Sequence, residues 1–178
     1  MILRPLRLSA PSVVLMAVIL CVAAIAQEAL RVQLSPEYRK WLDEDVRWIM
    51  KPQERSQFLN LTSNQSRNQF VIDFWERRNP TPGSKENWFK KEHYQRLAFS
   101  NDHFAVGVAG SKTDRGRIYV VYGPPDSIVT HDSSSTSPRD EVWLYRHMKG
   151  VGDEVTLKFV DDCYCGGYCL QNEPPNNE

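Results

Sequence analysis

The sequence predicts an α+β fold, in which an N-terminal helical half packs against a C-terminal antiparallel sheet. Across residues 35–104, apolar side chains recur at spacings of three and four, which is the period of a helix with one buried face. Across residues 117–170, β-branched and aromatic residues gather in short runs that end at glycine and proline, as strands do. Because the helices and strands fall in separate blocks of the chain, we expect an α+β rather than an alternating α/β architecture.

The first helix is expected to begin at Ser35, which is a suitable N-cap, with Pro36 as its first helical residue. Its apolar stripe would extend over about four turns and consists of Tyr38, Trp41, Leu42, Val46, Ile49 and Met50. The dipeptide Lys51-Pro52 ends this helix and starts a short second one, which carries Phe58, Leu59 and Leu61.

A third helix is predicted to follow a capping box at residues 62–65, in which Thr62 serves the amide of Gln65. Its inward-facing residues are Phe70, Val71, Phe74 and Trp75. Residues 79–83 cannot continue a helix because they contain two prolines and a glycine. A fourth helix over residues 85–104 would place Glu92 and Arg96 four apart as a surface ion pair. Its apolar side consists of Trp88, Phe89, Tyr94, Leu97, Ala98 and Phe104.

Four strands and a final hairpin are predicted for the C-terminal half. Arg117 to Tyr122 and Ile128 to His131 read as two strands around the turn at residues 123–126. After the Ser-rich residues 132–140, strands are expected at 141–147 and 153–160, and Val155, Leu157 and Phe159 alternate with polar residues in the second of these. Gly166-Gly167 then predicts a last hairpin, and residues 171–178 a polar tail.

Residues 1–26 are predicted to form a cleavable secretory signal peptide. Arg4 and Arg7 precede an uncharged apolar run at residues 13–26, which is too short for a membrane-spanning helix. This run ends at Ala24-Ile25-Ala26, so we expect cleavage before Gln27; an uncleaved N-terminal anchor is the alternative. The expected organisation is then a linker at 27–34, one domain at 35–170 and the tail. The protein would be exported to the periplasm or beyond, and would meet the membrane only through its signal peptide before cleavage.

Removing residues 1–26 leaves 152 residues, with 20 basic side chains against 22 acidic ones. A formal net charge of −2 argues against nucleic acid or an anionic membrane surface as a partner, because both select a basic excess. Three cysteines remain, namely Cys163, Cys165 and Cys169. In an oxidising compartment, an odd number leaves at least one outside any intramolecular disulfide.

Four motifs, in order along the chain, resemble the GWxTD domain family. They are Phe74-Trp75-x-x-Arg78-x-Pro80-Thr81-Pro82; Glu92-His93-Tyr94-x-Arg96; Gly110-x-x-Thr113-Asp114-Arg115-Gly116-Arg117-Ile118-Tyr119 with Gly123-x-Pro125-Asp126; and Trp143-x-Tyr145. The resemblance covers residues 35–170. It implies an exported bacterial protein and assigns no biochemical activity. The tryptophan for which the family is named is Ser111 here, and the three cysteines replace a short polar hairpin near the end of the domain.

Residues 114–117 are the densest charged motif. Arg115 and Arg117, with Asp126, are candidates for binding a carboxylate, a phosphate or an acidic sugar, because guanidinium groups bind such anions in bidentate fashion. The structural alternative is that Thr113 and Asp114 shape the turn into the strand. Arg115 or Arg117 would then pair with Asp126 or Glu76 across the helix–sheet junction.

His93 is a candidate general base, and an enzyme reading would combine it with Asp114 and Arg115 in a site that acts on an envelope polymer. No serine or cysteine nucleophile stands in a recognisable motif, and a lone histidine on a helix is commonly a packed residue. Convergence of these side chains in one pocket would favour catalysis or ligand binding. Separate positions, each with its own ion-pair partner, would favour a structural role.

The three cysteines support two interpretations. Cys163, Cys165 and Cys169, with His131 or His147, could hold zinc, although their spacing differs from structural-zinc patterns. Export instead favours a disulfide across the Gly166-Gly167 hairpin, with the third thiol free or paired between chains. We expect no cofactor. The sequence as a whole predicts a non-catalytic binding or assembly module, whose partner is an envelope protein or polymer. The alternatives are an envelope enzyme and a cysteine-based metal-binding module.

Overall fold

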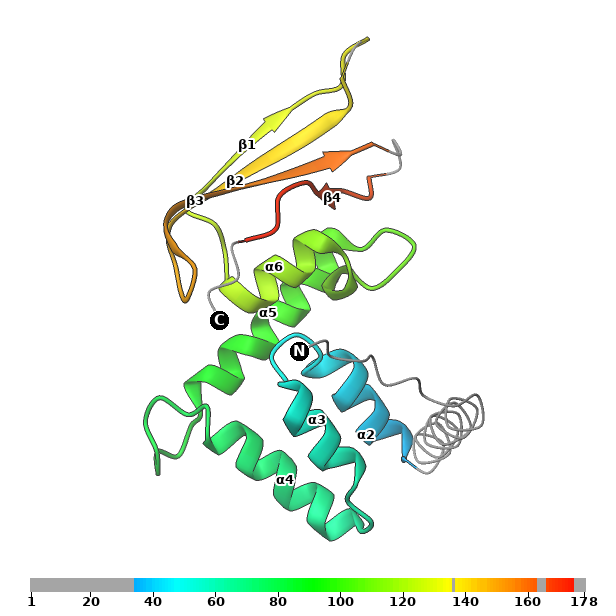
Figure 1. Ribbon diagram of the computed structural model, residues 1–178, viewed down its shortest axis with the longest axis vertical. Helices are drawn as coiled ribbons and strands as arrows, with labels where there is room; N and C mark the ends of the chain where they lie inside the picture. The colour runs from blue at the N-terminus through cyan, green and yellow to red at the C-terminus, as the bar shows by residue number, and fades with distance from the viewer. Residues whose placement is uncertain (1–33, 136, 163–165, 175–178) are drawn as a thin grey trace, which may run out of the picture.

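Five α-helices precede a four-stranded antiparallel sheet in the computed structural model, which describes residues 34–135, 137–162 and 166–174. The helices occupy one end of the molecule and the sheet the other (Figure 1). This arrangement confirms the predicted α+β class with its helical N-terminal part and C-terminal sheet. The predicted signal peptide at residues 1–26 lies outside the described residues.

The first helix is shorter than the sequence predicted. α2 (Pro36–Lys40) continues into a π-helical turn, η1 (Trp41–Asp45), and the chain then turns instead of completing four helical turns. The amide of Val46 donates to the carbonyl of Trp41, which closes the wide turn and ends the helix. Three members of the predicted apolar stripe, Trp41, Leu42 and Val46, are nevertheless buried.

The next two helices match the prediction, with one correction at a cap. α3 (Pro52–Leu59) begins at the expected proline, and α4 (Asn64–Glu76) buries Phe74 and Trp75. The N-cap of α4 is Ser63 rather than Thr62, because the Ser63 hydroxyl accepts from the amide of Ser66 at 3.1 Å. The helix therefore starts one residue later than the capping-box pattern indicated.

α5 (Trp88–Phe104) begins after the predicted break and is capped by Asn87, whose side chain accepts from the amide of Lys90. The expected pair between Glu92 and Arg96 is present at 2.5 Å. Trp88 was expected on the apolar side but is 56% exposed, because it lies at the very start of the helix.

The predicted strand from Arg117 to Tyr122 is wrong, because these residues belong to helix α6 (Asp114–Tyr122). The short 3₁₀ turn η2 (Gly110–Lys112) leads into it, and the Thr113 hydroxyl accepts from the amide of Gly116 at 3.2 Å as an N-cap. Apolar residues occur on two sides of α6 because the helix packs beside α5 and also contributes Ile118 to the core of the sheet. Burial on two sides produces the near-continuous apolar pattern that resembled a strand.

Two glycines allow α6 to pack closely against η2, and η2 against α5. A Cβ atom on Gly116 would lie 1.9 Å from the carbonyl oxygen of Gly110. A Cβ on Gly110 would lie 1.8 Å from the carbonyl oxygen of Ser100 on α5. The backbones of α5, η2 and α6 are therefore in direct contact, with no room for a side chain between them.

The sheet is a meander with strand order β1-β2-β3-β4. β1 (Ser127–His131), β2 (Arg139–Met148) and β3 (Gly152–Asp161) confirm the predicted strands at 128–131, 141–147 and 153–160, and Leu157 and Phe159 are buried as their alternation predicted. β4 (Cys169–Leu170) pairs antiparallel with β3, as the last hairpin prediction requires, although residues 163–165 of the connection lie outside the described residues.

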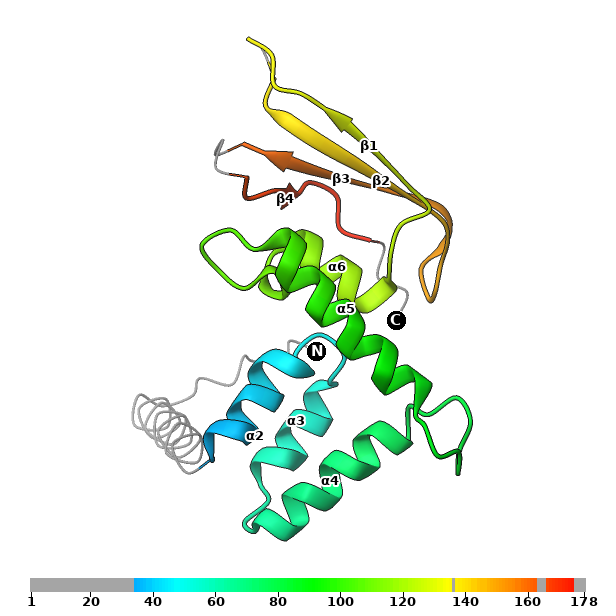
Figure 2. The same cartoon turned by 180° about the vertical axis from the view of Figure 1, so that it is seen from behind.

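The buried side chains form two clusters. One joins η1, α3, α4 and the residues that flank α2 and η1, and its members are Leu34, Trp41, Leu42, Val46, Phe58, Phe74 and Trp75. The other lies between the sheet, α6 and the end of α5, and its members are Phe104, Ile118, Trp143, Tyr145, Met148, Leu157, Phe159 and Tyr168. α5 contributes side chains to both, and both views show it crossing from the helical end to the sheet (Figures 1 and 2). The junction between the two cores therefore lies along α5.

Candidate functional site

The Arg115 side chain lies at the junction between the helices and the sheet and is bound there by other residues. Its Nη1 donates to Glu141 Oε1 of β2 at 2.9 Å, and its Nη2 donates to the carbonyl of Gly166 at 3.3 Å. The guanidinium carbon lies 4.0 Å from the centre of the Tyr168 ring and 5.1 Å from that of Phe104. Both side chains of the ion pair are largely buried, so Arg115 joins α6 to the sheet through a desolvated charge pair and ring contacts.

Arg117 and Asp114 also bind the C-terminal segment of the chain. Arg117 Nη2 pairs with Glu173 at 2.7 Å and lies 3.9 Å from Asp114. The second carboxylate oxygen of Asp114 accepts from the amide of Leu170 at 2.8 Å, which ties β4 to the first turn of α6. These contacts occupy the Arg117 guanidinium and the Asp114 carboxylate, which the sequence offered as candidate site residues.

The structure does not bring Asp126 together with Arg115 and Arg117. Asp126 follows the end of α6, accepts from the amide of Arg146 at 2.8 Å and forms an ion pair with that side chain. Glu76 lies elsewhere, and its carboxylate accepts from Asn79 and from the amide of Gly83. The ion-pair partners predicted for the two arginines, Asp126 and Glu76, are therefore wrong. The actual partners, Glu141 and Glu173, come from sheet residues and a C-terminal segment whose proximity depends on the tertiary fold.

His93 is buried on α5, and its Nε2 lies 2.6 Å from the carbonyl oxygen of Asp45 in η1. A carbonyl only accepts, so Nε2 carries the hydrogen. Its ring packs against those of Trp75 and Phe89. Burial lowers the pKa of His93, the contact with the Asp45 carbonyl opposes that change, and the charge of Arg96 lowers the pKa further. His93 is thus a neutral packed residue at neutral pH.

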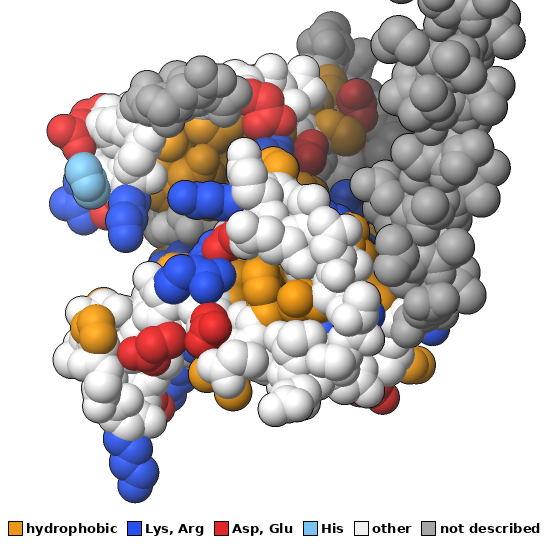
Figure 3. Space-filling model, turned by 60° about the horizontal axis from the view of Figure 1, so that its bottom comes forward, with side chains coloured by type: hydrophobic (Ala, Val, Ile, Leu, Met, Phe, Trp, Pro, Cys, Tyr) orange, Lys and Arg blue, Asp and Glu red, His pale blue; other side chains and the backbone are white. Residues whose placement is uncertain are grey.

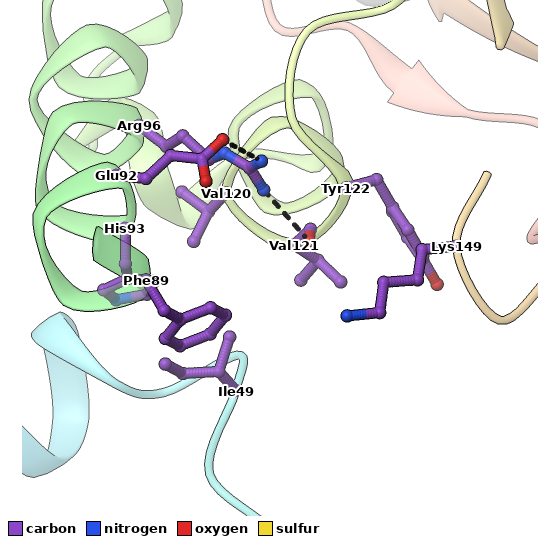
Figure 4. A pocket seen from close by; sticks show the side chains of 9 residues that line it. All are labelled: Ile49, Phe89, Glu92, His93, Arg96, Val120, Val121, Tyr122 and Lys149. Atoms are coloured by element: carbon purple, nitrogen blue, oxygen red, sulfur yellow. Dashed lines mark hydrogen bonds and ion pairs between the residues drawn. The ribbon is translucent and has the colours of Figure 1, made fainter. Parts of the chain in front are cut away.

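A pocket of about 300 Å³ opens beside His93 at the junction of the helices and the sheet. Its apolar lining consists of Ile49, Phe89, Val120 and Val121, and its polar lining of Glu92, His93, Arg96, Tyr122 and Lys149. Figure 4 shows that these side chains come from α5, α6, the loop after η1 and the turn between β2 and β3. From below, the molecule is visibly hollowed between its two parts, with apolar, basic and acidic side chains around the hollow (Figure 3).

Arg96 is held in place at the back of this pocket. Its Nη1 donates to the carbonyl of Val121 in the last turn of α6, and its Nη2 donates to Glu92. Gly123 has φ +90°, and a Cβ there would lie 2.9 Å from Arg96 Nη2, so the guanidinium packs directly on the glycine. The Arg96 Nε is buried without a partner among the described residues. Arg96 therefore caps the C-terminus of α6, where positive charge is favourable.

The far side of Gly123 is anchored to the sheet. The buried Tyr145 hydroxyl of β2 donates to the Gly123 carbonyl at 2.9 Å. Burial raises the pKa of Tyr145 above the ordinary tyrosine value, so the phenol keeps its proton. The end of α6 is thus fixed between α5 and β2.

Lys149 is the one cationic side chain of the pocket lining for which the described part of the chain provides neither a hydrogen bond nor an ion pair. It lies on the turn after β2, and its Nζ points back toward Val121 and Ile49, opposite Glu92 (Figure 4). In the lining, Arg96 and Lys149 are positively charged, Glu92 is negatively charged and His93 is neutral. The lining therefore carries one uncompensated positive charge.

The sequence placed Glu92, His93 and Arg96 together on one helix but did not identify the pocket. Lys149 was missed because its position beside the pocket, opposite α5, depends on how the β2–β3 hairpin bends back. The Lys149-Gly150 turn indicates a hairpin tip, but nothing local shows what that tip faces. Ile49 was read as one of the helix stripe residues, whereas it follows the helix and lines the pocket.

The cysteine predictions remain predictions. Cys163 and Cys165 lie outside the described residues, and Cys169 is exposed on β4. Within the described ranges, no group of three or more His, Cys, Asp or Glu side chains is placed to hold a metal ion. His131 pairs with Asp140 at 2.7 Å and His147 with Asp153 at 2.6 Å.

The position at which the family carries its tryptophan is buried although serine occupies it. Ser111 is 5% exposed, its amide donates to Asn101 Oδ1, and its carbonyl accepts from the indole of Trp48 at 2.7 Å. An aromatic contact with this loop is therefore supplied by Trp48, from the segment after η1. Among the described helices, none has the length and apolar character needed to cross a membrane.

The fold and the pocket together define an α+β domain with a ligand-sized cavity between its helical and sheet parts. The chain belongs to the GWxTD domain family, since the family model described as GWxTD domain matches residues 32–164. No curated protein and no solved structure matches the chain.

Proposed function

We propose that the protein is an exported, non-catalytic binding module of the cell envelope and that the pocket along α5 is its binding site. The observation that carries the proposal is the pocket itself. Its volume of about 300 Å³ is at the lower end of the range for small-molecule sites, and it combines apolar walls with a few charged groups. The signal peptide predicted at residues 1–26 supports export.

The lining argues for binding rather than catalysis. The lining residues include no Ser, Thr or Cys that could act as a nucleophile. The imidazole of His93 is bound to the Asp45 carbonyl through Nε2, and Asp114 and Arg115 do not line the pocket. The enzyme alternative needs these three side chains at one reacting centre.

Capture from the native envelope tests the proposal. Tagged protein containing residues 27–178 would be incubated with solubilised envelope from its own organism, and bound components would be identified. Val121→Phe fills the pocket, while Val108→Phe makes the same change at a side chain that is 55% exposed and outside the pocket lining. Thermal unfolding would establish that both variants are folded.

We expect the wild type and Val108→Phe to retain the same component and Val121→Phe to lose it. Equal capture by all three proteins would place the binding site elsewhere and contradict the proposal. Cell fractionation with N-terminal sequencing would test the export part, with Gln27 expected as the first residue of the exported form.

A further inference from the structure

We infer that the pocket binds a ligand that presents a carboxylate to Lys149 and buries an apolar group against Phe89 and Ile49. This inference rests on the proposed function, because it specifies what the same site would bind. It is argued from the distribution of charge, from the orientation that this charge imposes, and from the size of the cavity.

The charge of the lining selects an anion. Arg96 and Glu92 neutralise each other at 2.5 Å, and His93 is uncharged because burial lowers its pKa. Lys149 supplies the remaining positive charge. A lysine ammonium offers three donors and no acceptor, and carboxylates form strong charge-assisted hydrogen bonds with it.

Lys149, rather than Arg96, is the group available to this anion. Both Nη atoms of Arg96 already donate, to Val121 and to Glu92, and its Nε is buried. Lys149 instead extends over the pocket from the β2–β3 turn (Figure 4). Its flexible four-carbon stem allows the ammonium to follow a bound group.

The charges also set the orientation of the ligand. Glu92 lies on the α5 side of the pocket and Lys149 on the opposite side (Figure 4). A bound carboxylate is repelled by Glu92 and attracted by Lys149, so it lies beside the Lys149 ammonium. The remainder of the ligand then extends toward the Phe89 ring and Ile49, where apolar contact is favourable.

The size of the pocket limits the ligand to a small group. A cavity of about 300 Å³ holds roughly ten water molecules at liquid density. A carboxylate joined by a short linker to one ring or branched chain fills such a space. Two sources share this chemistry, namely a free small carboxylic acid and the C-terminal carboxylate of a protein whose last side chain is apolar.

An NMR titration of the ¹⁵N-labelled mature chain tests the assignment. The probes are 3-phenylpropionate and its neutral analogue 3-phenylpropanamide, together with acetyl-Gly-Gly-Phe with a free or an amidated C-terminus. We expect the two acids to shift the amide resonances of residues 120–123 and 149–151. The two amides should bind at least about fivefold more weakly, because they lose the charge-assisted hydrogen bond.

Lys149→Gln should weaken both acids by about fivefold to tenfold and leave the amides unchanged. Lys85→Gln is the matched control, because it removes the same charge from an exposed loop residue outside the pocket lining, and it should have no effect. Tighter binding of the peptide acid would identify a protein C-terminus as the source, and tighter binding of 3-phenylpropionate a free small acid.

Equal affinity for acids and amides, or an effect of Lys149→Gln on both alike, would overturn the carboxylate assignment. Absence of shifts at the pocket with all four probes would overturn it as well. The proposed function is judged separately by the envelope capture. Loss of capture with Val121→Phe but not with Lys149→Gln would keep the binding site and reject this ligand class.

Discussion

Arg78, two residues beyond the end of α4, forms a bidentate ion pair with Glu54 of α3. Arg78 Nη2 lies 2.6 Å from Glu54 Oε2, and Nη1 lies 3.0 Å from Oε1. The same guanidinium donates to the carbonyl of Ile49 at 3.0 Å and lies over the ring of Phe74. The pair therefore also positions Ile49, which forms part of the pocket wall.

Replacing Glu54 by Gln should lower the free energy of unfolding by about 2–3 kcal/mol, because Arg78 would be left as a largely buried, uncompensated charge. Urea unfolding at neutral pH would measure this loss. Glu86→Gln removes one partner of the more exposed pair with Lys91 and should cost no more than about 0.5 kcal/mol. Similar losses in the two variants would show that the Glu54–Arg78 pair contributes no more to the free energy of unfolding than an exposed ion pair does.

The same carboxylate predicts an acid-sensitive contribution to stability. Burial raises the pKa of Glu54, but hydrogen bonds from Arg78, the Lys51 amide and Arg77 outweigh it and lower the pKa to about 2. The unfolded chain protonates this group near pH 4.3. The contribution is therefore complete above about pH 4.3 and is lost as the pH falls toward 2. Glu54→Gln should flatten this part of the stability profile, and an unchanged profile would contradict the assignment.

We predict a second loss of stability at milder pH, caused by protonation of His93. Its pKa in the folded protein lies below the ordinary value near 6.5, so the unfolded chain binds a proton more readily. Stability should then be complete above about pH 6.5 and fall as the pH drops below it. Thermal unfolding between pH 7.5 and 5 would measure the slope.

His93→Gln keeps a donor for the Asp45 carbonyl and cannot titrate, so it should remove this slope. The exposed His103→Gln should not. A slope that survives in His93→Gln would mean that another group titrates in this range.

Arg115→Ala should lower the free energy of unfolding by about 3 kcal/mol, because it leaves Glu141 charged in a largely buried position and removes ring contacts with Tyr168. Arg146→Ala, at a side chain that is 74% exposed, should cost about 0.5 kcal/mol or less. Chemical denaturation of the two variants would separate the roles. An Arg115→Ala variant of unchanged stability would restore this arginine as a ligand-binding candidate.

Gly116→Ala should be the most damaging of these substitutions, at about 3 kcal/mol or more, because its Cβ would overlap the Gly110 carbonyl. Gln95→Ala on the exposed face of α5 is the comparison, and it should change stability by no more than about 0.5 kcal/mol. Circular dichroism during heating would measure both. A stable Gly116→Ala variant would show that α6 can move away from η2 at little cost.

Local patterns predicted the fold class, α3, α4, α5 and most of the sheet, because each of these elements has one buried face and a cap or break of its own. They failed at α6, where contacts on two sides masked the helical period. They also failed for the partners of Arg115 and Arg117, and for Lys149 over the pocket. These relationships join residues far apart in the chain, and no local spacing contains them.

The backbone contact between Gly110 and Gly116 also constrains how this domain can evolve. A side chain at Gly116 is tolerated only when α6 moves away from η2, and one at Gly110 only when η2 moves away from α5. A movement of α6 would displace Val120 and Val121 and so widen the cavity that they line. Descendants of this protein can therefore alter the pocket wall by substituting its exposed lining residues, but not by changing the two glycines.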